Sequence, residues 1–109
     1  MLKNDRSKVE INQRLKFLTK ILSLSEEKPI YEKYDKVFQF LEDGRINDGE
    51  NLIFDFLDEG GPDILRVAIS FYDRLNTYSD FELKELNFSR KEIKDGLDDI
   101  LNIYGLKLS

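Results

Sequence analysis

The sequence predicts an all-α fold, a compact helical bundle of about five main helices plus one short helix. Two observations lead to this prediction. Apolar residues recur at helical spacing along almost the whole chain. No stretch alternates apolar and polar residues over more than a few positions, as a half-buried strand would. With 109 residues, 40% of them hydrophobic, residues 1–109 suit a single helical domain with a real core.

The first predicted helix lies within residues 1–24, a basic amphipathic segment. Ser7 is its candidate cap, and Glu10 three residues later makes a weak capping box with it. Its apolar residues form one stripe down the helix: Ile11, Leu15, Leu18 and Leu22. Residues 25–29 interrupt the pattern, and Pro29 can open the next helix because a first helical position needs no N–H donor.

Residues 30–59 have the form of one tetratricopeptide-like helical hairpin. Its first helix should end at Gly44, which can adopt the left-handed conformation. Its second helix should begin near Asn47, whose side chain can accept from the backbone N–H of Glu50 while Glu50 reaches back. Gly60 and Gly61 then end that helix. No second copy of the hairpin is visible, so the sequence does not predict a repeat array.

The fourth predicted helix opens at Pro62 and carries a wide apolar stripe, so we expect it to be central: Ile64, Leu65, Ala68, Ile69, Phe71, Tyr72 and Leu75. Two capping boxes with hydrophobic staples follow, Ser79-x-x-Glu82 and Ser89-x-x-Glu92. The first opens a short helix that ends near Asn87. The second opens a longer helix that Gly105 closes, with Leu106 folding back as the apolar contact of a Schellman motif.

Gly96 lies inside the last predicted helix, where glycine costs ~1 kcal/mol relative to alanine. We expect it to allow another helix to approach closely.

Phe17, Phe40 and Phe54 lie off the main stripes of their helices. They could widen a core face or belong to an exposed patch that pairs with another subunit.

The missing residue types exclude several kinds of chemistry. The chain has no cysteine and no histidine, which excludes thiolate metal sites, cysteine nucleophiles and the usual serine triad. Two acidic clusters fail the spacing of a calcium loop and are interpreted as solvated faces: Asp55, Asp58, Glu59 and Asp63, and Asp95, Asp98 and Asp99. No carboxylate is seen within an apolar stripe and no phosphate-binding loop precedes a helix. We therefore predict no enzyme activity and no catalytic, cofactor-binding or metal site.

Charge is distributed unevenly along the chain. Residues 1–24 hold six basic and two acidic residues, whereas residues 25–109 form an acidic helical body with 11 basic and 20 acidic residues. An acidic body does not attract phosphate backbones, so nucleic-acid binding is not expected. The basic segment could dock on its own acidic body, on a partner or on an anionic membrane.

No apolar run approaches the ~20 residues that span a bilayer, and no secretory signal is visible. We expect a cytoplasmic protein with no integral membrane insertion.

Four segments carry a pattern seen elsewhere: residues 43–47, 68–76, 87–97 and 103–105. Through them the chain resembles, over roughly residues 10–105, a family of short all-helical proteins of unknown function from Gram-positive bacteria. This resemblance implies a bacterial cytoplasmic setting, and because the family has no accepted activity, cofactor or active site, no catalytic role carries over.

The sequence thus predicts a non-enzymatic module for protein–protein interaction or self-assembly, either as a homo-oligomer or with a protein partner. An amphipathic helix face would lie in an apolar groove. The predicted interface lies on the first helix: Ile11, Leu15, Phe17, Leu18 and Leu22. The alternative is an immunity or antitoxin-like acidic protein that neutralises a basic partner, steered by the charge of residues 25–109. A third possibility places the first helix on a membrane surface.

Overall fold

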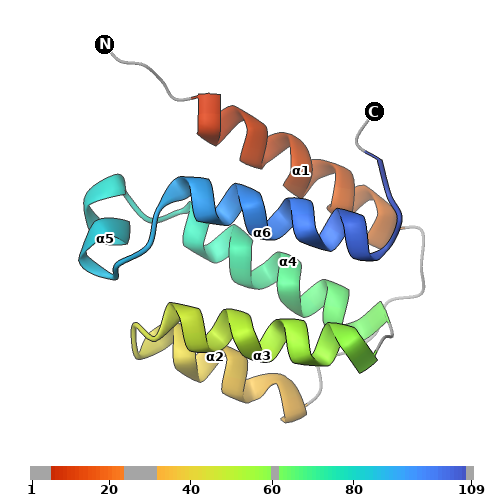
Figure 1. Ribbon diagram of the computed structural model, residues 1–109, viewed down its shortest axis with the longest axis horizontal. Coiled ribbons are helices and arrows are strands. Elements are labelled where there is room, and N and C mark those ends of the chain that lie inside the picture. Colours follow the sequence, from red (N-terminus) through yellow and green to blue (C-terminus); the bar gives the residue numbers. More distant parts are fainter. Residues whose placement is uncertain (1–5, 24–31, 60–61, 108–109) are drawn as a thin grey trace.

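The computed structural model describes residues 6–23, 32–59 and 62–107, and within these ranges every regular element is helical (Figure 1). The α-helices and one 3₁₀ helix follow in the order α1 (Arg6–Ser23), η1 (Glu32–Tyr34), α2 (Asp35–Glu42), α3 (Ile46–Glu59), α4 (Pro62–Asn76), α5 (Asp80–Glu85) and α6 (Arg90–Ile103). The all-α prediction, with a single short helix before the last one, is confirmed.

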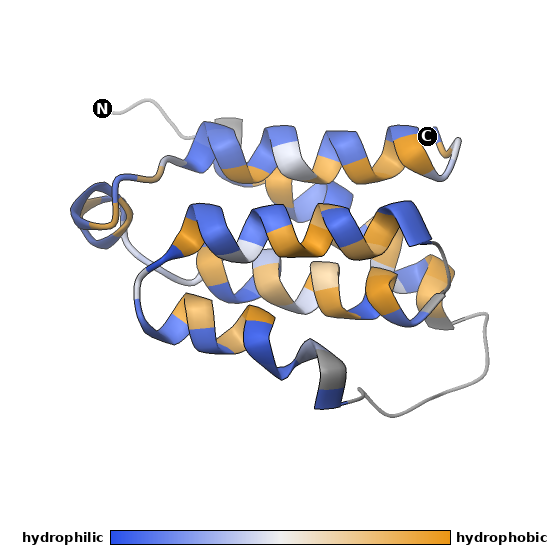
Figure 2. Cartoon of the chain, turned by 60° about the horizontal axis from the view of Figure 1, so that its bottom comes forward, coloured by the Kyte–Doolittle hydropathy of each residue, from blue (hydrophilic) through white to orange (hydrophobic). Residues whose placement is uncertain are grey.

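Helix α4 is the centre of the bundle, as its wide apolar stripe predicts. It contacts α1, α2, α3 and α6. Figure 1 shows α1 and α6 on one side of α4 and the α2–α3 hairpin on the other. Figure 2 shows that the apolar faces of these helices turn toward one another. Along α4 the side chains with no exposed area are Ile64, Val67, Ala68, Phe71, Tyr72 and Leu75.

Within residues 6–23, 32–59 and 62–107, three helices end in the same backbone turn, in which a residue with positive φ follows the helix. Gly44 (φ 79°), Asn87 (φ 59°) and Gly105 (φ 65°) adopt this conformation. After α6 the N–H of Leu106 donates to the carbonyl of Leu101 over 2.8 Å, and the Leu106 side chain packs against the core. This is the predicted Schellman motif, and the predicted end at Gly44 is confirmed as well.

The predicted capping boxes are formed at both positions, one of them completely. At Ser79 the hydroxyl accepts from the N–H of Glu82, and the Glu82 carboxylate accepts from the N–H of Ser79. At Ser89 the hydroxyl also accepts from the N–H of Glu92, but the Glu92 carboxylate accepts from the Ser89 hydroxyl instead of the backbone. Both helices are therefore nucleated by local sequence.

The predicted capping box at Asn47 is wrong. The N–H of Arg45 donates to the carbonyl of Phe40, and the carbonyl of Arg45 accepts from the N–H of Gly49. The chain therefore passes from the turn at Gly44 directly into α3, which begins at Ile46, and Asn47 lies within the helix. The carboxylate of Glu50 accepts a hydrogen bond from Tyr72 on α4 instead.

Other boundaries differ by small amounts or cannot be compared. Helix α1 begins at Arg6, so Ser7 lies in its first turn and is not its cap. Residues 32–34 form a 3₁₀ turn, and α2 proper begins only at Asp35. The predicted break at residues 25–29, the opening at Pro29 and the end at residues 60–61 lie outside the described residues. None of the described helices is both long and apolar enough to cross a bilayer.

Candidate functional site

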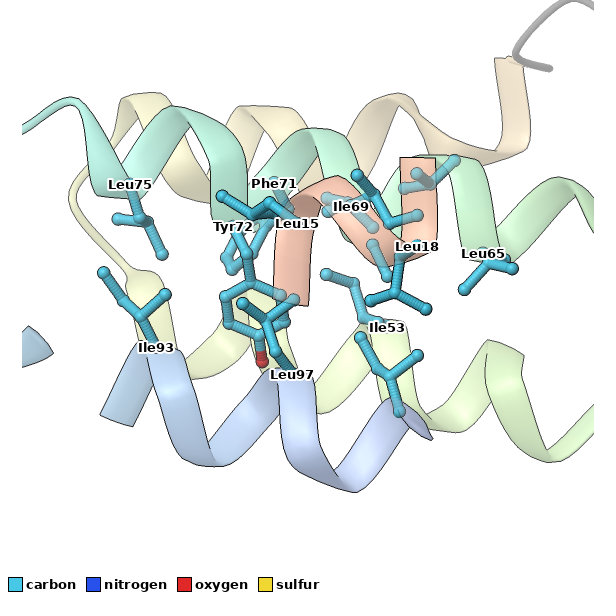
Figure 3. Close-up of a cluster of buried hydrophobic side chains, with 14 of the residues drawn as sticks. Leu15, Leu18, Ile53, Leu65, Ile69, Phe71, Tyr72, Leu75, Ile93 and Leu97 are labelled. Carbon is cyan, nitrogen blue, oxygen red and sulfur yellow. The ribbon is translucent and has the colours of Figure 1, made fainter. Parts of the chain in front are cut away.

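The N-terminal helix is the segment that the sequence predicts to carry an interface, and the structure packs its apolar stripe against the chain's own core. Helix α1 contacts α4 and α6. Ile11 and Leu18 have no exposed area and Leu15 is 7% exposed; Figure 3 shows Leu15 and Leu18 among the buried side chains of α4 and α6. Phe17 and Leu22 are partly buried against the same core. This packing leaves Ile11 and Leu18 with no surface for a partner, while Leu15, Phe17 and Leu22 keep part of their surface, so the predicted interface stays a prediction at those three residues.

One ion pair joins α1 to the acidic body. The Arg14 guanidinium donates through Nε to a carboxylate oxygen of Asp98 on α6 and through Nη1 to the carbonyl of Glu10 over 2.8 Å. Lys94 donates to the other oxygen of Asp98 over 3.1 Å. Burial alone would raise the pKa of Asp98, but these two hydrogen bonds outweigh burial and hold the pKa below its usual value. Part of the basic charge of α1 is thus neutralised within the chain.

The outward side of α1 borders an open groove of about 730 Å³. Its lining residues come from α1 and, in one case, from α4: Val9, Asn12, Gln13, Leu15, Lys16, Thr19, Lys20 and Asp73. Val9 is an apolar residue that is 56% exposed. The groove therefore combines exposed apolar surface with neighbouring amide, hydroxyl and ammonium groups.

The charge around this groove is opposite to that of the whole protein. Lys16 and Lys20 are both exposed and lie four residues apart, which places them next to each other on the helix. Asp73 contributes the one carboxylate among the lining residues. The lining of the groove thus carries more positive than negative charge, in a chain whose formal charge is −5.

A second arrangement, which the sequence reading missed, joins α3 to α4. The Tyr72 hydroxyl donates to the Glu50 carboxylate over 2.5 Å, a length typical of a hydrogen bond to a charged acceptor. Tyr72 has no exposed area, and Glu50 is partly buried. The signal was present in the sequence, because Glu50 lies four residues after Ile46 and three before Ile53, on the apolar stripe of its helix.

Burial is the main influence on both members of this pair. It raises the pKa of Glu50, and the nearby charges of Glu92 and Asp99 raise it further, while the Tyr72 hydrogen bond acts in the opposite direction. Burial also raises the pKa of Tyr72 well above its usual value, helped by the adjacent Glu50 carboxylate. The expectation that no carboxylate is desolvated is therefore wrong.

The ring of Tyr72 occupies the space that a side chain at position 96 would fill. A Cβ built on Gly96 would lie 2.9 Å from Cε1 of Tyr72 and closer still to Cζ and the hydroxyl oxygen. Gly96 therefore gives room to α4, as predicted, but the group that fills the space is the Tyr72 side chain and not the helix backbone (Figure 3). Neither Tyr72 nor Glu50 lines the groove on α1. Their hydrogen bond links α4 to α3 inside the bundle.

The other predicted clusters have ordinary surroundings. In the acidic clusters, Asp98 binds Arg14 and Lys94, and Asp95 binds Lys91. Across residues 6–23, 32–59 and 62–107, no group of three or more aspartate or glutamate side chains is placed to hold a metal ion.

Phe17 and Phe54 pack against the core, which they widen. Phe40 lies beneath the cations of Lys36 and Arg45, with their charged groups 5.1 and 4.8 Å from the ring centre.

With this geometry established, the chain can be compared with known proteins. The model of a family of unknown function, DUF6483, matches residues 1–105. The chain belongs to DUF6483. No curated protein matches it, and neither does any solved structure. Membership of DUF6483 agrees with the expected resemblance to a family without assigned activity. It supplies no ligand or partner, so the surface of α1 remains the feature on which a functional argument can rest.

Proposed function

We propose that this DUF6483 protein is a non-enzymatic protein-interaction module and that the groove along α1 is its contact surface. The observation that carries the proposal is the combination of exposed Val9 with Lys16 and Lys20 beside one groove of an otherwise acidic chain. Apolar surface supplies affinity when it is removed from water, and charge of the opposite sign steers the approach of a partner. A matching partner presents apolar side chains flanked by carboxylates.

The packing of α1 supports this role because it holds the surface rigid. Ile11 and Leu18 anchor the inner face of the helix, and the Arg14–Asp98 ion pair fixes its position on α6. A preformed surface loses less conformational freedom when a partner binds. We further propose a bacterial cytoplasmic setting, with a protein rather than a nucleic acid as the partner, since the net charge of −5 repels phosphate backbones.

The test is the size of the native complex in cells that make this protein. The full chain, tagged and expressed at its own level, is compared with Val9→Asp/Lys16→Glu by size-exclusion chromatography of the extract. A matched control, Ile103→Asp/Lys107→Glu, introduces the same substitutions at another exposed apolar residue and another exposed lysine. We expect the wild type and the control to elute in a salt-sensitive complex and the groove variant to elute as a monomer. Equal elution of all three contradicts the proposal.

A second candidate is an immunity or antitoxin-like role, in which an acidic surface neutralises a basic partner. The observation in its favour is that Glu92 and Asp99 lie near enough to Glu50 to raise its pKa, so negative charge gathers between α3 and α6. A basic partner would relieve this repulsion. Under this candidate, Glu92→Gln/Asp99→Asn would dissociate the native complex, whereas Val9→Asp/Lys16→Glu would not.

A membrane surface is the third kind of partner for α1. Co-sedimentation with vesicles of anionic and of neutral lipid separates it from protein binding. If the wild-type protein sediments with anionic vesicles in a way that depends on Lys16, and forms no complex in extracts, then the partner of α1 is a lipid surface and not a protein.

A further inference from the structure

Helix α5 carries the most exposed large hydrophobic side chain of the described residues. Phe81 is 70% exposed, compared with 56% for Val9 and 50% for Ile103. Figure 1 shows α5 projecting from one end of the bundle, beyond the ends of α4 and α6. Aromatic side chains are common anchors at protein interfaces because they bury a large area at a small cost in conformational entropy.

The segment that presents Phe81 is firmly held. The complete capping box at Ser79 fixes the start of α5, and Leu83, 1% exposed, anchors its inner side. Arg90, whose side chain is 10% exposed, ties α5 to the end of α4. Its guanidinium donates to the carbonyl of Tyr78 over 2.7 Å, to the Asp80 carboxylate over 2.9 Å and to the carbonyl of Asn76 over 3.2 Å. Phe81 is therefore displayed by a rigid turn.

The charges around Phe81 complement those around the groove on α1. Helix α5 holds three carboxylates, from Asp80, Glu82 and Glu85, and one ammonium group; Asp80 is paired with Arg90, so the local excess of negative charge comes from Glu82 and Glu85. The groove has two ammonium groups and one carboxylate among its lining residues, with exposed Val9 as an apolar contact. Helix α5 thus has the chemistry expected of the partner described above, an apolar anchor flanked by carboxylates.

We propose that the occupant of the groove is α5 of a second copy of this chain, with Phe81 placed against Val9 and the carboxylates of α5 facing Lys16 and Lys20. The inference rests on the proposed function, because it assigns a partner to the same groove. The two contacting surfaces differ, so each copy offers one α5 and one groove. Association is weakened by salt, which screens the charge pairs, and it retains a salt-resistant part from the Phe81–Val9 contact.

The test uses purified full-length protein in sedimentation equilibrium over a range of concentrations. We expect the wild type and the control Ile103→Asp/Lys107→Glu to self-associate. Phe81→Asp, which damages only α5, and Val9→Asp/Lys16→Glu, which damages only the groove, should each weaken association about tenfold or more. All variants are first checked by circular dichroism for wild-type helix content and thermal midpoint.

Mixing the two damaged proteins is the decisive step. One retains an intact groove and the other an intact α5, so the mixture should form a one-to-one pair at concentrations where neither variant associates alone. If the mixture fails to associate, the inference is overturned. It is also overturned if Phe81→Asp on its own self-associates as strongly as the wild type. A wild type that is monomeric at every concentration also overturns it. In that case the proposed function still stands if the complex in cell extracts depends on Val9 and Lys16, and it fails if that complex does not.

Discussion

Replacing Gly96 by alanine tests the contact in which the ring of Tyr72 lies against the backbone of α6. At an unobstructed helical site this substitution stabilises a protein by about 1 kcal/mol. Here the new methyl carbon would lie 2.9 Å from Cε1 of Tyr72 and closer to two further ring-end atoms, so the ring or the helix must move. Steric overlap of this kind costs about 1–3 kcal/mol in a packed core.

The same movement disturbs the Tyr72–Glu50 hydrogen bond. If the hydroxyl leaves its position, the partly buried Glu50 carboxylate loses its donor, which costs about a further 1–3 kcal/mol. Subtracting the gain in helix propensity leaves a net loss of about 1–5 kcal/mol. For a chain of this length, a loss near 3 kcal/mol lowers the thermal midpoint by about 12–24 °C.

The assay is urea unfolding followed by circular dichroism, with two reference proteins. Asn102→Ala, at an exposed position of the same helix, reports a smaller gain in helix propensity that comes without steric overlap. Tyr72→Leu removes the hydroxyl, Cζ and Cε1, which are the three atoms that the new methyl group would overlap. Gly96→Ala should therefore cost much less in the Tyr72→Leu background than in the wild type. An equal cost in both backgrounds, or stabilisation by Gly96→Ala as large as that of Asn102→Ala, would refute the reasoning.

Three further outcomes follow from the polar contacts. Burial raises the folded-state pKa of Glu50 above 4.5, so the stability that its protonation contributes is complete below pH 4.5 and is lost as pH rises through the raised pKa. Glu50→Gln should therefore gain in urea stability relative to wild type as pH rises above 4.5, and a difference that does not change with pH would contradict this. Arg90→Lys cannot reproduce the planar set of hydrogen bonds to α4 and α5 and should lose about 2–4 kcal/mol, whereas the exposed Arg45→Lys should lose less than about 1 kcal/mol in the same assay. Arg14→Gln removes a donor that lowers the pKa of Asp98. The variant should therefore be less stable than the wild type at neutral pH, and this difference in stability should shrink as pH falls below the usual aspartate value of 3.8. A difference that does not depend on pH would contradict the role of this ion pair.

Local signals in the sequence were sufficient to predict the order of the helices and most of their ends. The turns at Gly44 and Gly105 and the cap at Ser79 depend on residues within a few positions of one another. Such contacts form with little loss of chain entropy and are nearly independent of the rest of the fold. Gly96 was also interpretable, because an interior glycine weakens a helix and so suggests a tertiary reason for its presence.

The polar ties between helices could not be predicted in the same way. Glu50 fits a local capping pattern with Asn47, but its carboxylate meets Tyr72, 22 residues later in the chain. Arg90 is a cation in the first turn of α6, where the helix dipole disfavours positive charge. That mismatch was a clue that its guanidinium serves other elements, yet only the fold places Asn76, Tyr78 and Asp80 around it. The predicted interface has a related difficulty, because an amphipathic stripe does not say whether it faces its own chain or another.

The position of α1 determines how its role can be tested. Deletion of residues 1–24 would remove Ile11, Leu15 and Leu18 from the core, and loss of association would then follow from unfolding as readily as from loss of an interface. Substitutions confined to Val9 and Lys16 avoid this ambiguity, because both side chains are exposed. The basic charge of the helix divides in the same way: Arg14 is bound to Asp98 inside the bundle, while Lys16 lies beside the open groove. A partner that senses the charge of α1 must therefore do so through its outward side, and reversal of Lys16 should lower the rate of association more than the rate of dissociation rises.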